Sequence, residues 1–164
     1  MEQTNYSLKD AIQGTLAINQ IGELVLHYKR RVLRRDQPII KSSKDCYDIF
    51  MSSWDYGKLN LCEQFKVCLL AASGKVLGIC ELSTGGPTGT IVNVPFVIGV
   101  AILGNASSIL IAHNHPSGSL NPSKSDQAMT QKIKAAAALF DITLHDHIIV
   151  TDSGYLSFAE EGLL

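Results

Sequence analysis

One stretch decides how this chain folds: Ser108-Ile-Leu-Ile-Ala-His-Asn-His-Pro-Ser-Gly-Ser-Leu-Asn-Pro-Ser-Lys-Ser-Asp126. Its first half has the apolar character and the length of a strand, and this strand ends in His113-Asn114-His115. Residues two apart on a strand point to the same face, so both imidazoles can be aimed at one point. Pro116 and Gly118 then end the strand and turn the chain. The stretch therefore predicts a strand that carries two histidines at its exit.

A helical pattern follows, and it begins at Ser123 with Asp126 in its first turn. This spacing is typical of a helix N-cap, where the helix dipole also favours a carboxylate. The same carboxylate, two neutral imidazoles and a water molecule would form a ligand set suited to catalytic zinc. The two interpretations do not exclude each other. Because an isolated His-x-His is more often structural, the metal hypothesis depends on all these residues occurring together.

A family resemblance rests on these residues. The pattern His113-x-His115-Pro116 followed by Ser123-x-x-Asp126 resembles the JAMM motif of the JAB/MPN metallopeptidases, and His-Asn-His-Pro-Ser-Gly is similar to the RadC-like branch. The resemblance runs from about Cys62 to the C-terminus and includes Leu144-His145-Asp146-His147-Ile148-Ile149 and Tyr155-x-Ser157-Phe158. It implies an α/β fold of the JAB/MPN, cytidine-deaminase-like kind: one layered domain with a mixed, mostly antiparallel β-sheet flanked by helices.

The resemblance also implies a function. It indicates a zinc-dependent hydrolase of peptide or isopeptide bonds that binds Zn²⁺ through His113, His115 and Asp126. Relatives carry a glutamate at the head of the first core strand, which corresponds to Glu63 in Cys62-Glu63-Gln64-Phe65-Lys66-Val67. Glu63 would take the proton of the attacking water and pass it to the leaving amine, while the Ser123 hydroxyl would stabilise the oxyanion.

Two points about the site stay open. Without the family, Glu63 would be interpreted as an exposed glutamate at a strand end, and Glu81 on the adjacent predicted strand competes for its role. His145-Asp146-His147 is a second cluster of ligand types, in which strict strand alternation would put the two histidines on one face. A second metal site is one interpretation. We favour a role in orienting a metal ligand.

Composition sets the bounds. The chain has 164 residues, 46% hydrophobic and 18% charged, with a net charge of -1. The length leaves room for one folded domain and a short arm, which we place at residues 41–164, the RadC-like part, and residues 1–40. The net charge gives no general argument for nucleic acid or membrane binding. The N-terminus has no signal-peptide pattern, and the longest apolar stretch, Val94–Leu103, is too short to span a bilayer. We therefore expect a cytoplasmic protein without a membrane partner.

A basic run raises the alternative of nucleic acid binding. Five of the seven residues from Lys29 to Arg35 are basic, directly after a predicted strand over Ile21–Tyr28. Such a run can contact phosphates weakly, and RadC-like proteins are often labelled as DNA repair factors. We favour a solvated strand edge blunted by charge, since longer relatives carry a helix-hairpin-helix module for which this chain has no room. A non-catalytic binding module is a third hypothesis, disfavoured because all four motif positions are filled. The peptide or protein substrate is not specified.

The remaining elements follow from local patterns. The four cysteines form no Cys-x-x-Cys pair, which argues against a zinc ribbon and predicts reduced, half-buried thiols. Asn93 predicts the start of a helix that runs to about Asn105 and is apolar nearly all round. Such a helix is either buried or part of an interface, for example in a homo-oligomer. The family has charged or polar residues where this helix has Pro95-Phe96-Val97. We also predict a helix over Asp45–Met51 capped by Ser42 or Ser43, strands over Phe65–Ala72, Lys75–Leu82, Ile142–Leu144, Ile148–Val150 and Tyr155–Phe158, a turn at Gly85–Gly89, and a helix over Ser123–Phe140 whose core face holds Met129, Ile133 and Phe140.

Overall fold

A computed structural model of the chain describes residues 33–164. The predicted arm up to residue 32, which includes the strand over Ile21–Tyr28 and the basic residues 29–31, lies outside the described residues. In the described part, five strands form one sheet of order β2-β1-β3-β4-β5. The elements in chain order are η3 (Arg34–Asp36), α1 (Ser43–Met51), α2 (Tyr56–Leu59), β1 (Gln64–Leu70), β2 (Val76–Thr84), α3 (Val94–Leu103), β3 (Ser108–Asn114), α4 (Lys124–Ala138), β4 (Thr143–Thr151) and β5 (Gly154–Ser157).

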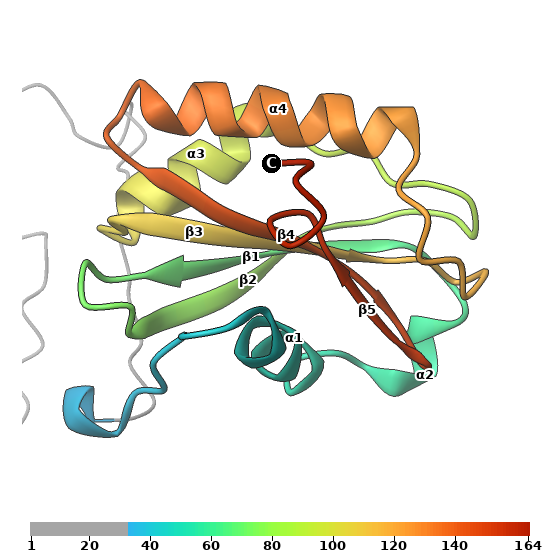
Figure 1. Cartoon of the computed structure of the whole chain (residues 1–164), viewed down its shortest axis with the longest axis horizontal. Coiled ribbons are helices and arrows are strands. Elements are labelled where there is room, and N and C mark those ends of the chain that lie inside the picture. Colours follow the sequence, from blue (N-terminus) through green and yellow to red (C-terminus); the bar gives the residue numbers. More distant parts are fainter. Residues whose placement is uncertain (1–32) are drawn as a thin grey trace, which may run out of the picture.

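The sheet is mixed and mostly antiparallel, as predicted. β1 pairs antiparallel with β2 and β3, β4 pairs antiparallel with β5, and β3 and β4 run parallel. A parallel pair needs a crossover connection, and here α4 provides it by running across the sheet between the two strands (Figure 1). β3 is therefore the central strand, and its C-terminal end lies between β1 and β4.

Helices cover both faces of the sheet. α3 and α4 lie over one face, and α1 and α2 lie on the other side (Figure 1). The side chains of β3 divide accordingly: Ile109 and Ile111 belong to the core under α3 and α4, while Leu110 and Ala112 belong to the core against α1. His113 continues the first series, so the alternation of a strand places it under α4.

Side-chain caps begin two helices where the sequence predicts them. The Ser42 hydroxyl accepts a hydrogen bond from the Asp45 amide at 3.2 Å, and the Asn93 side chain accepts one from the Phe96 amide at 3.1 Å. α3 buries one side and leaves Phe96 and Leu103 about half exposed, so the helix that is apolar all round is only partly covered. Among the described residues, no helix has the length and apolar character needed to cross a membrane.

The predicted core position of Phe140 is wrong. α4 ends at Ala138, and the chain then reverses through Asp141, whose φ of 57° lies in the left-handed region. The amide of Ile142 donates to the Ala137 carbonyl at 3.1 Å and closes this turn. Phe140 therefore points outward and is 54% exposed, and Ile142 fills the core below the helix end.

The end of the basic run is also not a strand edge. Arg34–Asp36 forms the short 3₁₀ helix η3, and the guanidinium of Arg35 lies 3.7 Å from the Asp36 carboxylate. The predicted strand edge is thus wrong for these two arginines. The rest of the run falls outside the described residues.

β4 contains a bulge that the sequence pattern does not predict. The two strand-like segments form one continuous strand, in which Leu144 pairs with Ile109 but Asp146 pairs with Leu110. His145 is the extra residue and is exposed, whereas Asp146 and His147 are buried. Leu144 and His147 both face α4, although they are three positions apart. The expectation that His145 and His147 share a face is therefore wrong.

The four cysteines are free thiols, in agreement with the sequence analysis. Cys46 and Cys68 are fully buried on the α1 side of the sheet, and burial raises the pKa of each thiol to about 12. Cys62 and Cys80 are half buried. At neutral pH the two buried thiols therefore serve as small apolar side chains.

Candidate metal centre

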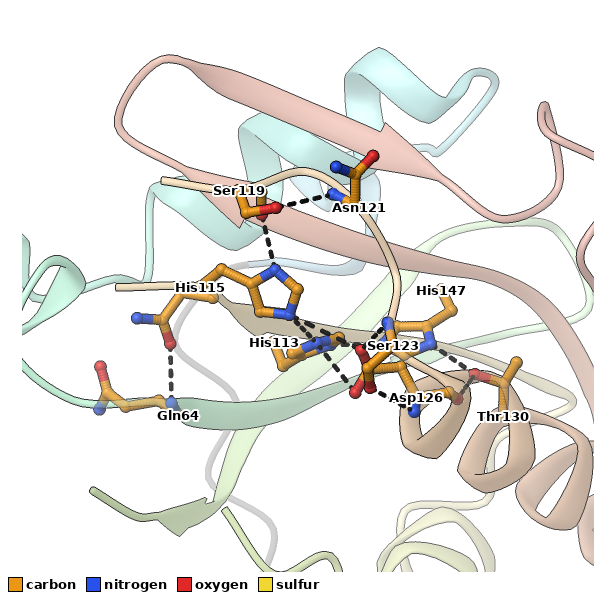
Figure 2. A network of polar contacts seen from close by, with 10 residues as sticks. Gln64, His113, His115, Ser119, Asn121, Ser123, Asp126, Thr130 and His147 are labelled. Carbon is orange, nitrogen blue, oxygen red and sulfur yellow. Dashed lines mark hydrogen bonds and ion pairs between the residues drawn. The ribbon is translucent and has the colours of Figure 1, made fainter. Parts of the chain in front are cut away.

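Three side chains of ligand type converge where β3 meets the start of α4. His113 Nε2 lies 3.0 Å from His115 Nε2 and 3.5 Å from Asp126 Oδ1, and His115 Nε2 lies 3.7 Å from Asp126 Oδ2 (Figure 2). One ligand atom from each residue falls within 4.8 Å of the other two. The structure therefore brings together the three residues predicted to hold a metal.

The strand and the turn after it fix the two imidazoles. His113 is the penultimate residue of β3, pairs with Phe65 on β1 and Ile149 on β4, and is 1% exposed. His115 follows the strand, where its amide donates to the Val150 carbonyl at 3.1 Å. The Nδ1–H of His115 donates to the Ser119 carbonyl at 2.6 Å, which directs Nε2 toward His113. Gly118 permits the turn between them with a φ of 77°.

The start of α4 fixes the carboxylate. Ser123 and Asp126 form a capping box: the Ser123 hydroxyl accepts from the Asp126 amide at 3.1 Å, and Asp126 Oδ2 accepts from the Ser123 amide at 2.7 Å. Asp126 therefore caps the helix and faces the two imidazoles at once. Both interpretations of this serine and aspartate, as cap and as part of a polar site, describe the same geometry.

The electrostatics of this cluster suit a cation. The Ser119 carbonyl can only accept a hydrogen bond, so the ring proton of a neutral His115 lies on Nδ1. The lone pair of its Nε2 then points toward His113. The neighbouring Asp126 carboxylate raises the pKa of His115 above its ordinary value, against the effect of burial. Burial alone would raise the pKa of Asp126, but contacts with His113, His115 and Ser123 outweigh it and lower that pKa. An ionised carboxylate between two imidazole nitrogens is a donor set that a divalent cation fits.

A cavity of about 750 Å³ opens over the cluster. All five residues singled out by the sequence contribute to its wall, namely Glu63, His113, His115, Ser123 and Asp126. Residues of the segments 87–92 and 116–121 also line this cavity. A molecule in this cavity would therefore contact the three candidate ligands together with a glutamate and a serine.

The two candidate glutamates lie in different surroundings. Glu63 sits just before β1, where its amide and carbonyl bond Gly86 and Gly85, and its half-buried side chain lines the cavity. Within residues 33–164, no hydrogen bond or ion pair holds its carboxylate. The Glu81 carboxylate instead accepts from Gln64 Nε2 at 2.7 Å, lies 3.7 Å from Lys66 Nζ and takes no part in the cavity wall. Of the two glutamates, Glu63 alone lines the cavity over the candidate metal centre.

Two further residues, His147 and Thr130, are linked to the cluster through the Nδ1 atom of His113. His147 is fully buried, and its ring lies between His113 and Thr130, at 2.8 Å from His113 Nδ1 and 2.6 Å from Thr130 Oγ1 (Figure 2). Burial lowers the pKa of His147 well below its ordinary value, so this imidazole is neutral. The sequence had marked His147 as part of a second cluster, but Thr130 had no signal beyond its place in a helix.

Comparison with known proteins places these residues in a family context. A family model described as the RadC-like JAB domain matches residues 40–163. The UPF0758 protein of Flavobacterium johnsoniae is 42% identical over 124 residues, which cover 76% of this chain and 53% of that protein. The UPF0758 protein of Porphyromonas gingivalis is 45% identical over 103 residues, covering 62% and 45%, and that of Acidovorax sp. is 36% identical over 144 residues, covering 85% and 59%. The chain thus spans about half the length of the curated relatives it matches.

Proposed function

Because this chain belongs to the RadC-like JAB domain family, we propose that it is a zinc-dependent hydrolase of peptide or isopeptide bonds. One observation carries the proposal: His113, His115 and Asp126 converge in a cavity that also holds the Glu63 carboxylate, which makes no hydrogen bond or ion pair with the described residues. Candidate metal ligands and a carboxylate that can serve as a general base, together in one cavity, suit the hydrolysis of an amide.

Zinc is the metal that this donor set fits best. Two imidazoles and one carboxylate match the three protein ligands of catalytic zinc sites, which keep a further position open. Calcium and magnesium prefer sites made of oxygen ligands, and Fe–S clusters need thiolates. When bound, zinc supplies Lewis acidity, which makes water a better nucleophile at neutral pH and polarises a carbonyl group.

The chain's own residues would do the rest of the chemistry. The Glu63 carboxylate takes the proton of the attacking water and then delivers it to the nitrogen that leaves. The Ser123 hydroxyl oxygen accepts a hydrogen bond from the Asp126 amide in the capping box. The hydroxyl proton can therefore be donated to the substrate's carbonyl oxygen as negative charge develops there. The walls at 87–92 and 116–121 would hold the substrate beside these groups.

Metal content and hydrolysis measured together test this proposal. We expect the purified protein, reconstituted at neutral pH, to retain about one zinc ion per chain and to cleave members of a panel of peptides and isopeptide-linked conjugates. The matched control is the double variant His113→Ala, His115→Ala, which should retain neither zinc nor activity. Absence of any transition metal in the reconstituted wild-type protein would refute the proposal, whatever the panel shows.

Duplex DNA binding is the competing function, and it rests on the basic run at residues 29–35. Within the described part of this run, Arg35 forms an ion pair with Asp36, with 3.7 Å between Arg35 Nε and Asp36 Oδ1. We expect binding to duplex DNA to be weak, in the range of about 10⁻⁴–10⁻⁶ M at physiological salt, and to weaken steeply as salt rises. Fluorescence anisotropy over a salt series measures this. A nanomolar, sequence-specific complex at physiological salt would rank the repair function above hydrolysis.

A further inference from the structure

We propose that His147 and Thr130 are positioning residues that hold His113 in its Nδ1–H tautomer, so that the Nε2 lone pair of His113 is directed into the candidate metal centre. The inference rests on the proposed function in one respect, since it takes His113 to be a metal ligand. It goes further by assigning a role to two residues that lie outside the ligand set and outside the cavity wall.

A single chain of hydrogen bonds carries the argument. It starts at the backbone carbonyl of Asp126, which accepts from the Thr130 hydroxyl at 2.6 Å. Thr130 Oγ1 also lies 2.6 Å from His147 Nδ1, and His147 Nε2 lies 2.8 Å from His113 Nδ1 (Figure 2). The chain thus links the first turn of α4 to β3 through β4, and all its side chains are buried.

The direction of every proton in this chain follows from its first bond. A carbonyl oxygen can only accept, so the single hydroxyl proton of Thr130 is used on the Asp126 carbonyl. The Thr130 oxygen must then accept from His147 Nδ1–H. A neutral His147 has one ring proton, so its Nε2 accepts and His113 Nδ1 donates. His113 is left with a bare Nε2, the atom that lies 3.0 Å from His115 Nε2.

Packing keeps the His147 ring in the orientation that this chain needs. The ring stacks on Phe158, with centroids 4.4 Å apart, and meets the edge of Phe65 at 6.3 Å. A ring flip would break both hydrogen bonds inside a fully buried site, where unpaired polar atoms are unfavourable. His147 therefore acts as a fixed relay between Thr130 and His113.

This arrangement makes the two histidine ligands alike. The Ser119 carbonyl accepts the hydrogen bond from His115 Nδ1–H directly. For His113, Nδ1–H donates to His147, and the chain of hydrogen bonds ends at the Asp126 carbonyl, which accepts from Thr130. In both cases a backbone carbonyl selects the tautomer that leaves Nε2 free. Partners of this kind set ligand orientation and basicity, and their loss typically weakens metal binding by about 10–100-fold.

The pair Thr130→Val and Thr130→Ser tests the inference without disturbing the ring packing. Valine keeps the shape of threonine but lacks the hydroxyl, and serine keeps the hydroxyl. Two quantities are measured: the ¹⁵N shifts of the His113 ring in metal-free protein at about pH 9, where histidine is neutral, and zinc affinity by competition with a chromophoric chelator. We expect one Nδ1–H tautomer in the wild type and in Thr130→Ser. In Thr130→Val we expect a mixture of tautomers and an affinity about 10–100-fold lower.

Each outcome decides the inference separately from the proposed function. Wild-type zinc affinity and unchanged His113 shifts in Thr130→Val would overturn it, because a merely structural threonine would lower only the stability. An Nε2–H tautomer of His113 in the wild type would also overturn it, even if zinc binds. If the wild type binds no zinc, the proposed function fails, and the ¹⁵N shifts of the metal-free proteins still decide whether Thr130 and His147 set the tautomer.

Discussion

Glu63→Gln should lower hydrolysis by about 10²–10⁴-fold, the usual scale for the loss of a general acid–base group, while the fold and the bound zinc remain. The amide keeps the shape of the carboxylate but cannot take a proton from water. The change should not disturb the fold, because the side chain has no hydrogen bond or ion pair among residues 33–164 and the backbone of Glu63 is held by Gly85 and Gly86. Steady-state kinetics and metal content of the same preparation give both quantities.

Glu81→Gln is the matched control for this prediction. It removes a carboxylate of the same kind from the neighbouring strand, where that carboxylate pairs with Gln64 and Lys66 outside the cavity. Its activity should stay within a few-fold of the wild type. Zinc lost together with activity in Glu63→Gln would make Glu63 a ligand or a structural support. Full activity of Glu63→Gln, or loss confined to Glu81→Gln, would show that the wrong carboxylate has been assigned.

Asp126→Asn should weaken zinc binding by at least about tenfold, because it removes the charged ligand of the set. The asparagine oxygen can still accept the Ser123 amide at the position of Oδ2, so the helix cap should survive. The metal-free variant should lose less than about 1 kcal/mol of unfolding free energy, the scale of one carboxylate at a helix N-terminus. Chelator competition and urea unfolding of the metal-free protein measure the two effects.

Ser123→Ala should affect the stability of the protein and leave zinc affinity unchanged, which is the opposite of the result expected for Asp126→Asn. It removes the oxygen that accepts the Asp126 amide, so it should lower the unfolding free energy by about 1 kcal/mol. It leaves the carboxylate in place, so zinc affinity should change little. Equal zinc affinity of Asp126→Asn and the wild type would contradict the assignment of Asp126 as a ligand.

The sequence predicts the local part of this site well. His113 and His115 share a face because strand geometry repeats every two residues, and Ser123 with Asp126 forms a cap because the first turn of a helix brings them together. Both relations span a few residues, and local geometry is enough to derive them. Glu63 lies on a different strand, and only the family resemblance pointed to it.

The sequence does not predict the part of the site that depends on tertiary packing. Strict alternation placed His145 and His147 on one face, because no glycine or proline in β4 signals the bulge. Thr130 is one of several polar residues of α4, and its hydroxyl gains a role only because a buried imidazole lies across from it. Phe140 was assigned to the core because the helical pattern continues past Ala138, where the backbone actually turns.

The bulge in β4 gives its residues unequal tolerance to mutation. His145 is exposed, so its chemical identity can vary with little effect, and as the extra residue of the bulge it pairs with no residue of β3. Deleting it would remove the bulge and leave Leu144 and His147 two positions apart, so regular alternation would keep both on the face toward α4. Among homologous chains, this strand should therefore accept exchange or loss of the residue at position 145. It should resist the loss of a single residue after His147, which would turn the following side chains to the opposite face.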